Sequence, residues 1–341
     1  MTQEKLTNGN WLGMDVFSAS RIGGRQENQD AYATIETDLG YLAVVCDGMG
    51  GGPAGRVASD LAVSEIVAEM CEPTMDNTPA NILVKAIRRA NMAILEMEDE
   101  HPELVGMGTT VAAVLINANS AIVAHVGDSR VYQLRCGHKI FRTFDHSLVF
   151  EYVSKGLLTE EQARLSAESN IITRALGVKP DVEVDVKEIP YERGDRFVIT
   201  TDGVHGMMPE SDLLKMLGRR GRNIGAMVDN VVTLIDDRGF AQGGGHDNMT
   251  IVMIETKTDS KLKPSMTREM RWGVMALTFV CLLSLLTNVF QSCGRHAEST
   301  RMVALTDTIS ARDAQIKAQH DSIKMLNDTI SKIRGNKKVV K

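Results

Sequence analysis

Residues 41–54 read YLAVVCDGMGGGPA, an apolar run that ends at an aspartate and a series of glycines. The run Leu42–Cys46 is typical of a buried strand. Apolar residues at helical spacing follow over Pro53–Met70, and the proline near the start of this segment loses no helical hydrogen bond. The stretch therefore predicts a strand that places Asp47 at the edge of a sheet, directly before a helix.

The same two patterns recur through residues 1–257. Further strand-like apolar runs lie at Thr110–Ile116, Ala121–Val126, Arg196–Thr200 and Thr250–Ile254. Further helices are expected at Pro79–Glu98, Glu210–Leu217 and Ile224–Asp236. The polar, helical stretch Asp145–Gly177 between two groups of strands indicates an insertion or flap. Strands in both halves, with long helices between them, predict an α+β sandwich with sheets in the middle and helices outside.

The bulk properties of the chain limit its function. The 341 residues are 43% hydrophobic, which is enough for the core of one sizeable domain or two. The net charge is -6 and no large basic block occurs, which argues against nucleic acid as the main partner. The five cysteines form no CxxC pair, which indicates reduced thiols in a cytosolic domain. The first residues lack the apolar segment of a secretory signal, so we expect none.

Residues 272–290 read WGVMALTFVCLLSLLTNVF, a run of nineteen residues without a charge. At about 1.5 Å per residue such a helix spans roughly 28 Å, close to the hydrocarbon thickness of a bilayer. A buried core helix is the alternative. Five Lys or Arg residues precede the run closely and two follow it, which favours a cytoplasmic N-terminal part. We therefore expect a single-pass protein of the cell inner or plasma membrane, with a linker at 258–271 and an extracytoplasmic tail at 291–341.

The tail carries a seven-residue apolar repeat. Its first positions are Met302, Ile309, Ile316, Ile323 and Ile330. Three of the five companion positions are Leu305, Leu326 and Ile333, whereas the other two are Arg312 and Gln319. This a/d pattern predicts a coiled coil that joins two copies of the chain as a parallel homodimer. A single amphipathic helix is the alternative.

Aspartates next to glycine or asparagine mark the ends of the predicted strands. Asp47, Asp128 and Asp202 follow apolar runs, and Asp247 precedes another. A single Asp-Gly pair is ordinarily a turn, but the repetition gathers carboxylates that could not all stay ionised without cations. Such oxygen ligands suit Mg²⁺ or Mn²⁺ and not zinc. Two ions can activate a water for attack on phosphorus, and Arg25 is the candidate to clamp the phosphate.

The motifs RxxNxD, DGMGG, GTT, GDSR, TDG and GGxDN occur in this order over about residues 13–256. This ordered set resembles the type 2C metal-dependent protein Ser/Thr phosphatases. The resemblance implies a four-layer α-β-β-α sandwich with a central antiparallel β-sandwich and a two-metal cleft at one edge. It also implies that the chain removes phosphate from phosphoserine and phosphothreonine in proteins, reversing the action of a bacterial Ser/Thr kinase.

The resemblance also assigns roles to single residues of the metal pair. Asp47 would bridge both metals, and the backbone carbonyl of Gly48 would bind one of them. Asp202 and Asp247 would hold the other metal.

Further roles lie around this pair. Asp30 would act mainly through metal-bound water, and Arg25 would bind the substrate phosphate. Asp128 matches the aspartate of a third, weaker metal site, which it would share with Asp202. The segment Asp145–Gly177 resembles the flap that borders the cleft in bacterial members of the family.

Two positions differ from the pattern of some relatives. Gln29 stands where some carry Glu, and Met49 stands where many animal relatives carry a His proposed as general acid. Two routes for the leaving group therefore stay open. Metal-bound water could protonate the leaving oxygen, or the alkoxide could leave with help from the third metal. His146, His205 and His246 lie near motifs, and we interpret them as structural or solvated.

Two other functions are compatible with this fold. One is a membrane signalling module that binds phosphoproteins, or regulates a dedicated partner, without general catalysis. The loss of metal aspartates would favour it, but none of them is missing. The other is a phosphatase with one dedicated substrate, such as a phosphorylated anti-sigma-factor antagonist. The active phosphatase is the leading hypothesis.

Overall fold

The computed structural model describes residues 13–51, 53–72, 78–219, 223–263, 280 and 301–336. The chain divides into two compact units, Met1–Lys263 and Pro264–Lys341. Each unit is described by itself.

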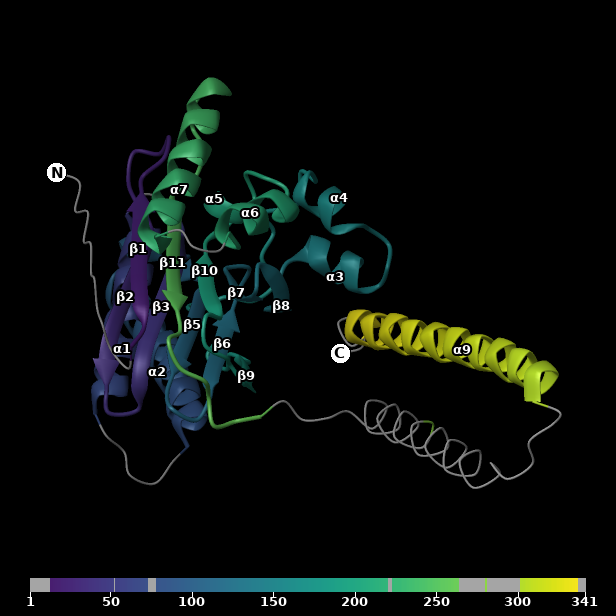
Figure 1. Ribbon diagram of the computed structural model, residues 1–341. Helices are drawn as coiled ribbons and strands as arrows, with labels where there is room; N and C mark the ends of the chain where they lie inside the picture. The colour runs from purple at the N-terminus through teal and green to yellow at the C-terminus, as the bar shows by residue number, and fades with distance from the viewer. Residues whose placement is uncertain are drawn as a thin grey trace. The chain divides into compact units, whose positions relative to one another are not determined.

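In the described residues, two antiparallel sheets form the centre of the first unit (Figure 1). One has the order β1-β11-β10-β7-β8, with bounds Asp15–Arg21, Met249–Glu255, Arg196–Thr200, Arg130–Arg135 and His138–Arg142. The other has the order β2-β3-β5-β6-β9, with bounds Asp30–Thr37, Gly40–Met49, Val111–Ile116, Ala121–Val126 and Asp185–Ile189. The short β4 (Gly108–Thr109) pairs with β3.

Helices connect and cover these sheets. Their bounds are α1 Ala54–Cys71, α2 Pro79–Glu100, a short 3-10 helix Pro102–Leu104, α3 Leu148–Ser154, α4 Glu160–Arg164, α5 Asp202–His205, α6 Glu210–Leu217 and α7 Ile224–Ala241. The predicted helices are confirmed, although α7 continues beyond Asp236 to Ala241.

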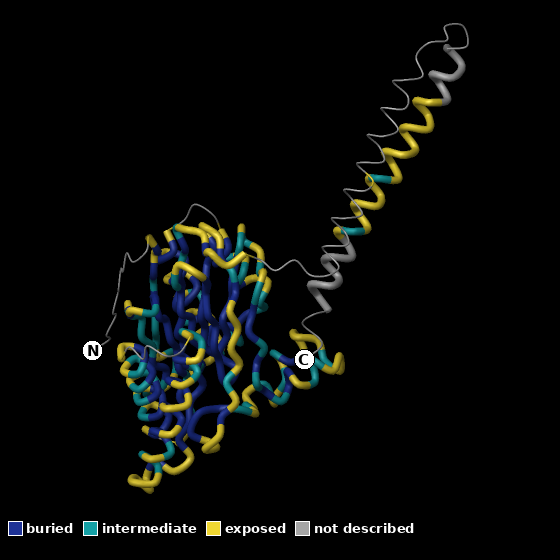
Figure 2. Tube along the Cα trace, turned by 90° about the horizontal axis from the view of Figure 1, so that it is seen from below, coloured by how far each residue is buried: buried dark blue, intermediate teal, exposed yellow. Residues whose placement is uncertain are grey.

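Alternation along β3 shows how the layers are packed. Leu42, Val44 and Cys46 face a core shared with α1 and α2, whereas Ala43 and Val45 face a core between the two sheets. Successive strand residues point to opposite faces, so a strand covered on both faces needs a continuous apolar run. A third core joins the other sheet to α6 and α7, and Figure 2 shows the strands as the most buried part of this unit. The predicted α+β sandwich is confirmed.

Six strands, β1, β2, β4, β7, β8 and β9, were not among the predicted apolar runs. Strand β7 shows the physical reason, because its buried residues include Arg130 and Gln133. Polar side chains inside a buried strand interrupt the apolar run, and only tertiary partners can satisfy them. Gln133, for example, donates through Nε2 to the carboxylate of Asp195, 2.8 Å away.

The predicted flap, Asp145–Gly177, contains α3 and α4. It has a small core of its own, in which Val149 and Phe150 of α3 pack with Ala163 of α4. Thr159 caps α4 in a reciprocal arrangement with Gln162, so this short helix is defined by local chemistry. Figure 1 shows α3 and α4 beyond β8, outside the sandwich.

The first unit ends at Lys263, whereas we predicted a linker from residue 258. Backbone hydrogen bonds hold this segment: Ser260 donates to Tyr191, and Leu262 donates to Asn119. Backbone hydrogen bonds produce no apolar pattern in the sequence, so the predicted end of the domain lay before this segment.

The second unit contains helix α9, Arg301–Asn336, within the predicted tail. Ile309, Ile316 and Ile323 of the repeat are 55%, 57% and 44% exposed, and the pairing of two such helices stays a prediction. Within the described residues, no helix is both long and apolar enough to cross a membrane. The predicted span at residues 272–290 lies outside them, except for Val280.

Candidate metal centre

The predicted aspartates meet where strands of both sheets end. Asp30 at the start of β2 lies opposite Asp47 near the end of β3. Asp202 begins α5 directly after β10, and Asp247 directly precedes the segment that enters β11. Asp128 lies in the turn between β6 and β7. Because β10 and β11 are neighbours, their ends bring residues that are far apart in the sequence to one edge.

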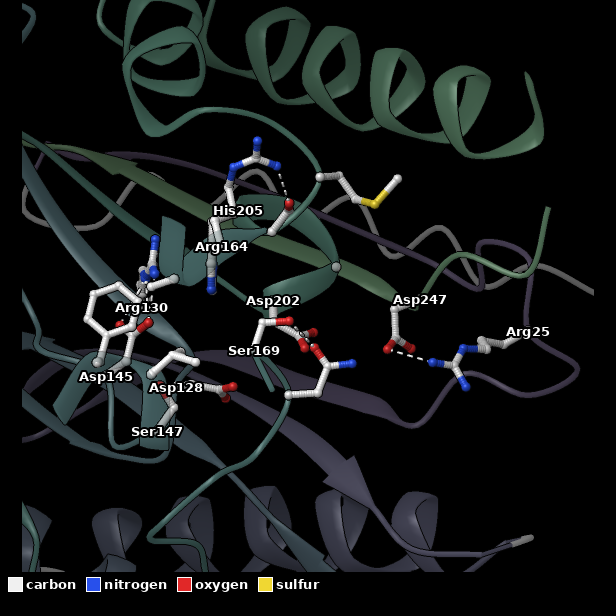
Figure 3. Close-up of a pocket in the computed structure, with 17 residues that line it drawn as sticks. Arg25, Asp128, Arg130, Asp145, Ser147, Arg164, Ser169, Asp202, His205 and Asp247 are labelled. Atoms are coloured by element: carbon white, nitrogen blue, oxygen red, sulfur yellow. Dashed lines mark hydrogen bonds and ion pairs between the residues drawn. The ribbon is translucent and has the colours of Figure 1, made fainter. Parts of the chain in front are cut away.

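A cleft of about 260 Å³ opens at this edge. Asp128, Asp202 and Asp247 line it together with Arg25. Figure 3 shows these side chains in a row, with Arg25 beside Asp247. The guanidinium Nη2 of Arg25 lies 2.8 Å from Oδ2 of Asp247, and about half of the arginine side chain is exposed. A phosphate that enters the cleft would therefore meet the arginine proposed to bind it.

The carboxylates raise one another's pKa. Burial first, and then the charges of Asp30 and Asp202, raise the pKa of Asp47 well above its usual range, although its side chain is partly exposed. Burial raises the pKa of Asp30 to about 7, with smaller contributions from other aspartates. Burial and then neighbouring carboxylates also raise the pKa values of Asp128 and Asp202. Charges this close need a cation to stay ionised near neutral pH.

Two carboxylate oxygens of the centre also lack hydrogen-bond partners. Within the described part of the chain, Oδ1 of Asp30 and Oδ1 of Asp202 are buried and make no hydrogen bond. Buried polar atoms are normally satisfied, and exceptions call for a ligand or a functional reason. An all-oxygen donor set with unused oxygens fits Mg²⁺ or Mn²⁺, so these residues fit the predicted metals.

Two glycines allow the backbone to close around this centre. A Cβ on Gly48 would lie 1.9 Å from the carbonyl oxygen of Gly55. A Cβ on Gly203 would lie 1.9 Å from the carbonyl oxygen of Asn248. Both glycines follow a metal-site aspartate, so each Asp-Gly pair is explained by close backbone approach and not only by a turn.

Three supporting residues were not predicted as part of the site. Thr110 Oγ1 accepts from the backbone N–H of Asp47 at 3.0 Å, and Thr109 Oγ1 donates to the Asp47 carbonyl at 2.9 Å. Asn248 Nδ2 donates to the carbonyls of Ile22 and Glu27 at 2.8 and 2.9 Å. These contacts hold Asp47 in β3 and join the loop of Arg25 to the segment of Asp247. The GTT and DN motifs were the signal that could have identified them.

The flap forms the opposite wall of the cleft. Its cleft-lining side chains include Ser147, Phe150, Arg164, Ser169 and Asn170. Arg164 donates to the carbonyl of Gly206, 3.0 Å away and just after α5, which ties α4 to the metal-bearing edge.

A buried ion pair lies beside Asp128 at the base of the flap. Arg130 donates to both carboxylate oxygens of Asp145, with Nε–Oδ1 at 2.9 Å and Nη2–Oδ2 at 2.6 Å. Phe150 of the flap stacks over the Arg130 guanidinium, whose central carbon is 4.9 Å from the ring centroid. The pair therefore connects β7 to the start of the flap.

Comparison with known proteins identifies the family. A family model described as protein phosphatase 2C matches residues 18–229. The chain belongs to the protein phosphatase 2C family. The Serine/threonine phosphatase stp of Listeria innocua is 34% identical over 243 residues, which cover 70% of this chain and 94% of that protein. Protein phosphatase PhpP of Streptococcus pneumoniae is 29% identical over 250 residues, which cover 71% and 97%.

Solved structures share the fold of this family member. The serine/threonine phosphatase of S. agalactiae has a TM-score of 0.64 and 33% identity, covering 72% of this chain and all of that one. The catalytic domain of the phosphatase PstP, in complex with 2 manganese ions, has a TM-score of 0.59 and 31% identity, covering 71% and 97%.

Proposed function

We propose that this chain is a metal-dependent phosphatase that hydrolyses phosphoserine and phosphothreonine in proteins and so reverses the action of a Ser/Thr kinase. The observation that carries the proposal is the group of mutually repelling aspartates Asp128, Asp202 and Asp247 beside Arg25 in one cleft. Two further facts support it: the relatives are named serine/threonine phosphatases, and one similar structure holds 2 manganese ions.

The residues divide the work as follows. Asp47, the carbonyl of Gly48, Asp202 and Asp247 would hold two Mn²⁺ or Mg²⁺ ions, and Asp128 with Asp202 would hold a third. Bound ions supply an activated water and neutralise charge on the phosphate.

The remaining groups orient the reactants. Thr201 Oγ1 donates to Oδ2 of Asp30 at 3.0 Å, whereas Oδ1 of Asp30 is buried without a hydrogen-bond partner among the described residues. Arg25 can grip two phosphate oxygens with its planar guanidinium, in the geometry that favours arginine over lysine at such sites. Its contact with Asp247 keeps it at the metal edge.

Residues 1–263 should hydrolyse para-nitrophenyl phosphate and a phosphothreonine peptide only with Mn²⁺ or Mg²⁺. Excess EDTA should abolish turnover, and Mn²⁺ added back should restore it. Circular dichroism with and without EDTA controls for folding. A folded, Mn²⁺-loaded protein without turnover on either substrate would refute the enzyme and favour the phosphoprotein-binding module.

We further infer that residues 272–290 anchor the chain in the membrane, with the phosphatase unit in the cytoplasm. The charge-free run and the excess of basic residues before it support this. We also infer that the tail forms a homodimer through its repeat. Ile309, Ile316 and Ile323 recur on one face of α9 and are largely exposed, and a second copy of the helix would cover them.

Expression of the full chain beside a chain that ends at Lys263 tests this arrangement. We expect the full chain in the carbonate-resistant membrane fraction and, after cross-linking, as a dimer. The truncated chain should be soluble and monomeric. External protease should remove the tail and spare the phosphatase unit. Recovery of the full chain in the soluble fraction would contradict the membrane anchor. Recovery of the full chain only as a monomer after cross-linking would contradict the pairing of the tails.

A further inference from the structure

A second polar cluster lies at the base of the flap, apart from the predicted metal ligands. His125 comes from β6, His146 from the start of the flap, Arg174 from its end and Asp185 from β9. The two imidazole rings stack, with centroids 4.6 Å apart and an angle of 17° between their planes. His125 donates through Nε2 to the carbonyl of Phe144, 2.8 Å away.

His146 contacts three separate segments through its polar groups. Its backbone N–H donates to the carbonyl of Gly127 at 2.9 Å, and its carbonyl accepts from the N–H of Thr173 at 2.8 Å. Its ring Nδ1 accepts from the N–H of Gly127 at 3.1 Å. Its Nε2 lies 3.4 Å from Oδ2 of Asp185. One residue therefore joins the entrance of the flap, the exit of the flap, and the turn that carries Asp128.

These contacts define the tautomer of the neutral ring. Because Gly127 donates to Nδ1, the ring proton lies on Nε2 and points to Asp185. The hydrogen bonds from His146 and Arg174 hold the pKa of Asp185 below its usual range. Arg174 Nη1 donates to Oδ1 of the same carboxylate at 2.8 Å. Asp185 thus receives one donor from each end of the flap.

The cluster does not suit a metal ion, although ligand atoms of His125, His146 and Asp185 lie within 4.8 Å of one another. Arg174 Nη1 is 3.2 Å from Nε2 of His146, so a permanent positive charge stands beside the ring nitrogen that a metal would use. A metal on Nε2 would also move the ring proton to Nδ1, where it would oppose the N–H of Gly127. The cluster is better explained as a link within the protein.

The turn that His146 holds is sensitive to its backbone geometry. Gly127 has a φ of +103°, in the region that favours glycine, and a Cβ there would lie 2.7 Å from Thr110 Cγ2. Asp128, the next residue, is buried and lines the cleft. A small rotation of this turn would therefore move the carboxylate of Asp128.

We propose that His146 is a positioning residue with two separable contacts. Its Nδ1–Gly127 contact orients Asp128 for the third metal site, and its Nε2–Asp185 contact fastens the two ends of the flap. The first half rests on the proposed function, because it assumes that Asp128 binds a metal. Partners that orient metal ligands typically change metal affinity about 10–100-fold when removed.

Two substitutions of His146 separate these contacts in the full chain. In His146→Asn, the side-chain oxygen can take the place of Nδ1 and accept from Gly127, but the side chain is too short to reach Asp185. In His146→Gln, the amide nitrogen can take the place of Nε2 and donate to Asp185, but no acceptor remains for Gly127. Asp185→Asn is a second way to weaken the flap contact while His146 keeps its bond to Gly127.

Mn²⁺ titration followed by electron paramagnetic resonance of free Mn²⁺ measures the affinity of the weakest metal site. Tryptic cleavage after Lys155, an exposed residue between α3 and α4, reads the flap. We expect His146→Gln to weaken the third site about tenfold or more with normal cleavage. We expect His146→Asn and Asp185→Asn to accelerate cleavage about tenfold while the third site changes less than about threefold. His101→Asn, at an exposed histidine outside both regions, should change neither measurement.

Equal effects of His146→Asn and His146→Gln on both measurements would overturn the proposal, because general destabilisation would then explain them. Unchanged values in both variants would also overturn it. If either His146 variant fails to fold, Asp185→Asn still tests the flap contact, and wild-type cleavage in it would refute that contact. Neither the Mn²⁺ titration nor the tryptic cleavage depends on turnover. A lack of hydrolysis would therefore refute the proposed function without refuting the role of His146.

Discussion

Asp47→Asn is expected to lower kcat/KM for para-nitrophenyl phosphate by about 10³-fold or more at saturating Mn²⁺, a loss of about 4 kcal/mol of transition-state stabilisation. Asp47 lies among the charges of Asp30, Asp128, Asp202 and Asp247, all of which raise its pKa. Its carboxylate therefore carries a charge that all four neighbours oppose in the metal-free fold. Asparagine keeps the shape of the side chain but removes the charge that would bridge two ions.

A stability measurement distinguishes lost metal binding from misfolding. The raised pKa of Asp47 shows that its ionised form is unfavourable in the metal-free fold, so the neutral variant should melt at the same temperature as the metal-free wild type or higher. The rise in melting temperature on addition of Mn²⁺ should be largely lost. Asp247→Asn should behave similarly. Full activity in the Asp47 variant would show that the metal assignment is wrong.

The pH dependence of metal binding follows from the same carboxylates. Asp30 has a pKa of about 7 in the fold against an ordinary 3.8, so in the metal-free protein it holds a proton below about pH 7. The positive charge of bound Mn²⁺ favours the ionised carboxylate, so metal binding is accompanied by the loss of this proton. The Mn²⁺ concentration at half-maximal activity should therefore increase as the pH falls from 8 to 6.

Asp145→Asn is expected to lower the free energy of unfolding by about 3–5 kcal/mol. The side chains of Arg130 and Asp145 are only 9% and 4% exposed, and the guanidinium bonds both carboxylate oxygens. Arg142 is also buried nearby and adds to the positive charge. Removing the carboxylate that Arg130 bonds leaves its guanidinium desolvated beside a like charge. Urea denaturation with EDTA present measures the effect without metal binding.

An exposed ion pair provides the matched control. Asp212 and Lys215 lie 3.0 Å apart on α6, but their side chains are 54% and 73% exposed. Asp212→Asn should change the free energy of unfolding by about 0.5 kcal/mol or less. The double variant Asp145→Leu with Arg130→Met should recover much of the loss, because it removes both buried charges. A denaturation midpoint for Asp145→Asn equal to that of the wild type would refute the expected role of the pair.

The sequence determined the parts of this protein that follow from local patterns. A strand covered on both faces needs uninterrupted apolar residues, so β3, β5, β6, β10 and β11 were visible as apolar runs. An aspartate followed by glycine at the end of such a strand was equally visible. The order of these motifs was sufficient to indicate the family and the aspartates that the structure brings to one edge.

Only the tertiary structure decided which groups support these aspartates. Thr110 bonds to Asp47 across 63 positions of the chain, and Asn248 bonds to Gln29 across 219. Such contacts depend on strand register, and no local periodicity records them. The buried charges of β7 concealed that strand for the same reason, because their partners lie in other elements. His146 was interpreted as structural or solvated, and its contacts with Gly127 and Asp185 specify a structural role, because they join the flap to the turn of Asp128. The apolar pattern and the aspartates were thus encoded locally, whereas their pKa values and orientation depend on neighbours that only folding brings together.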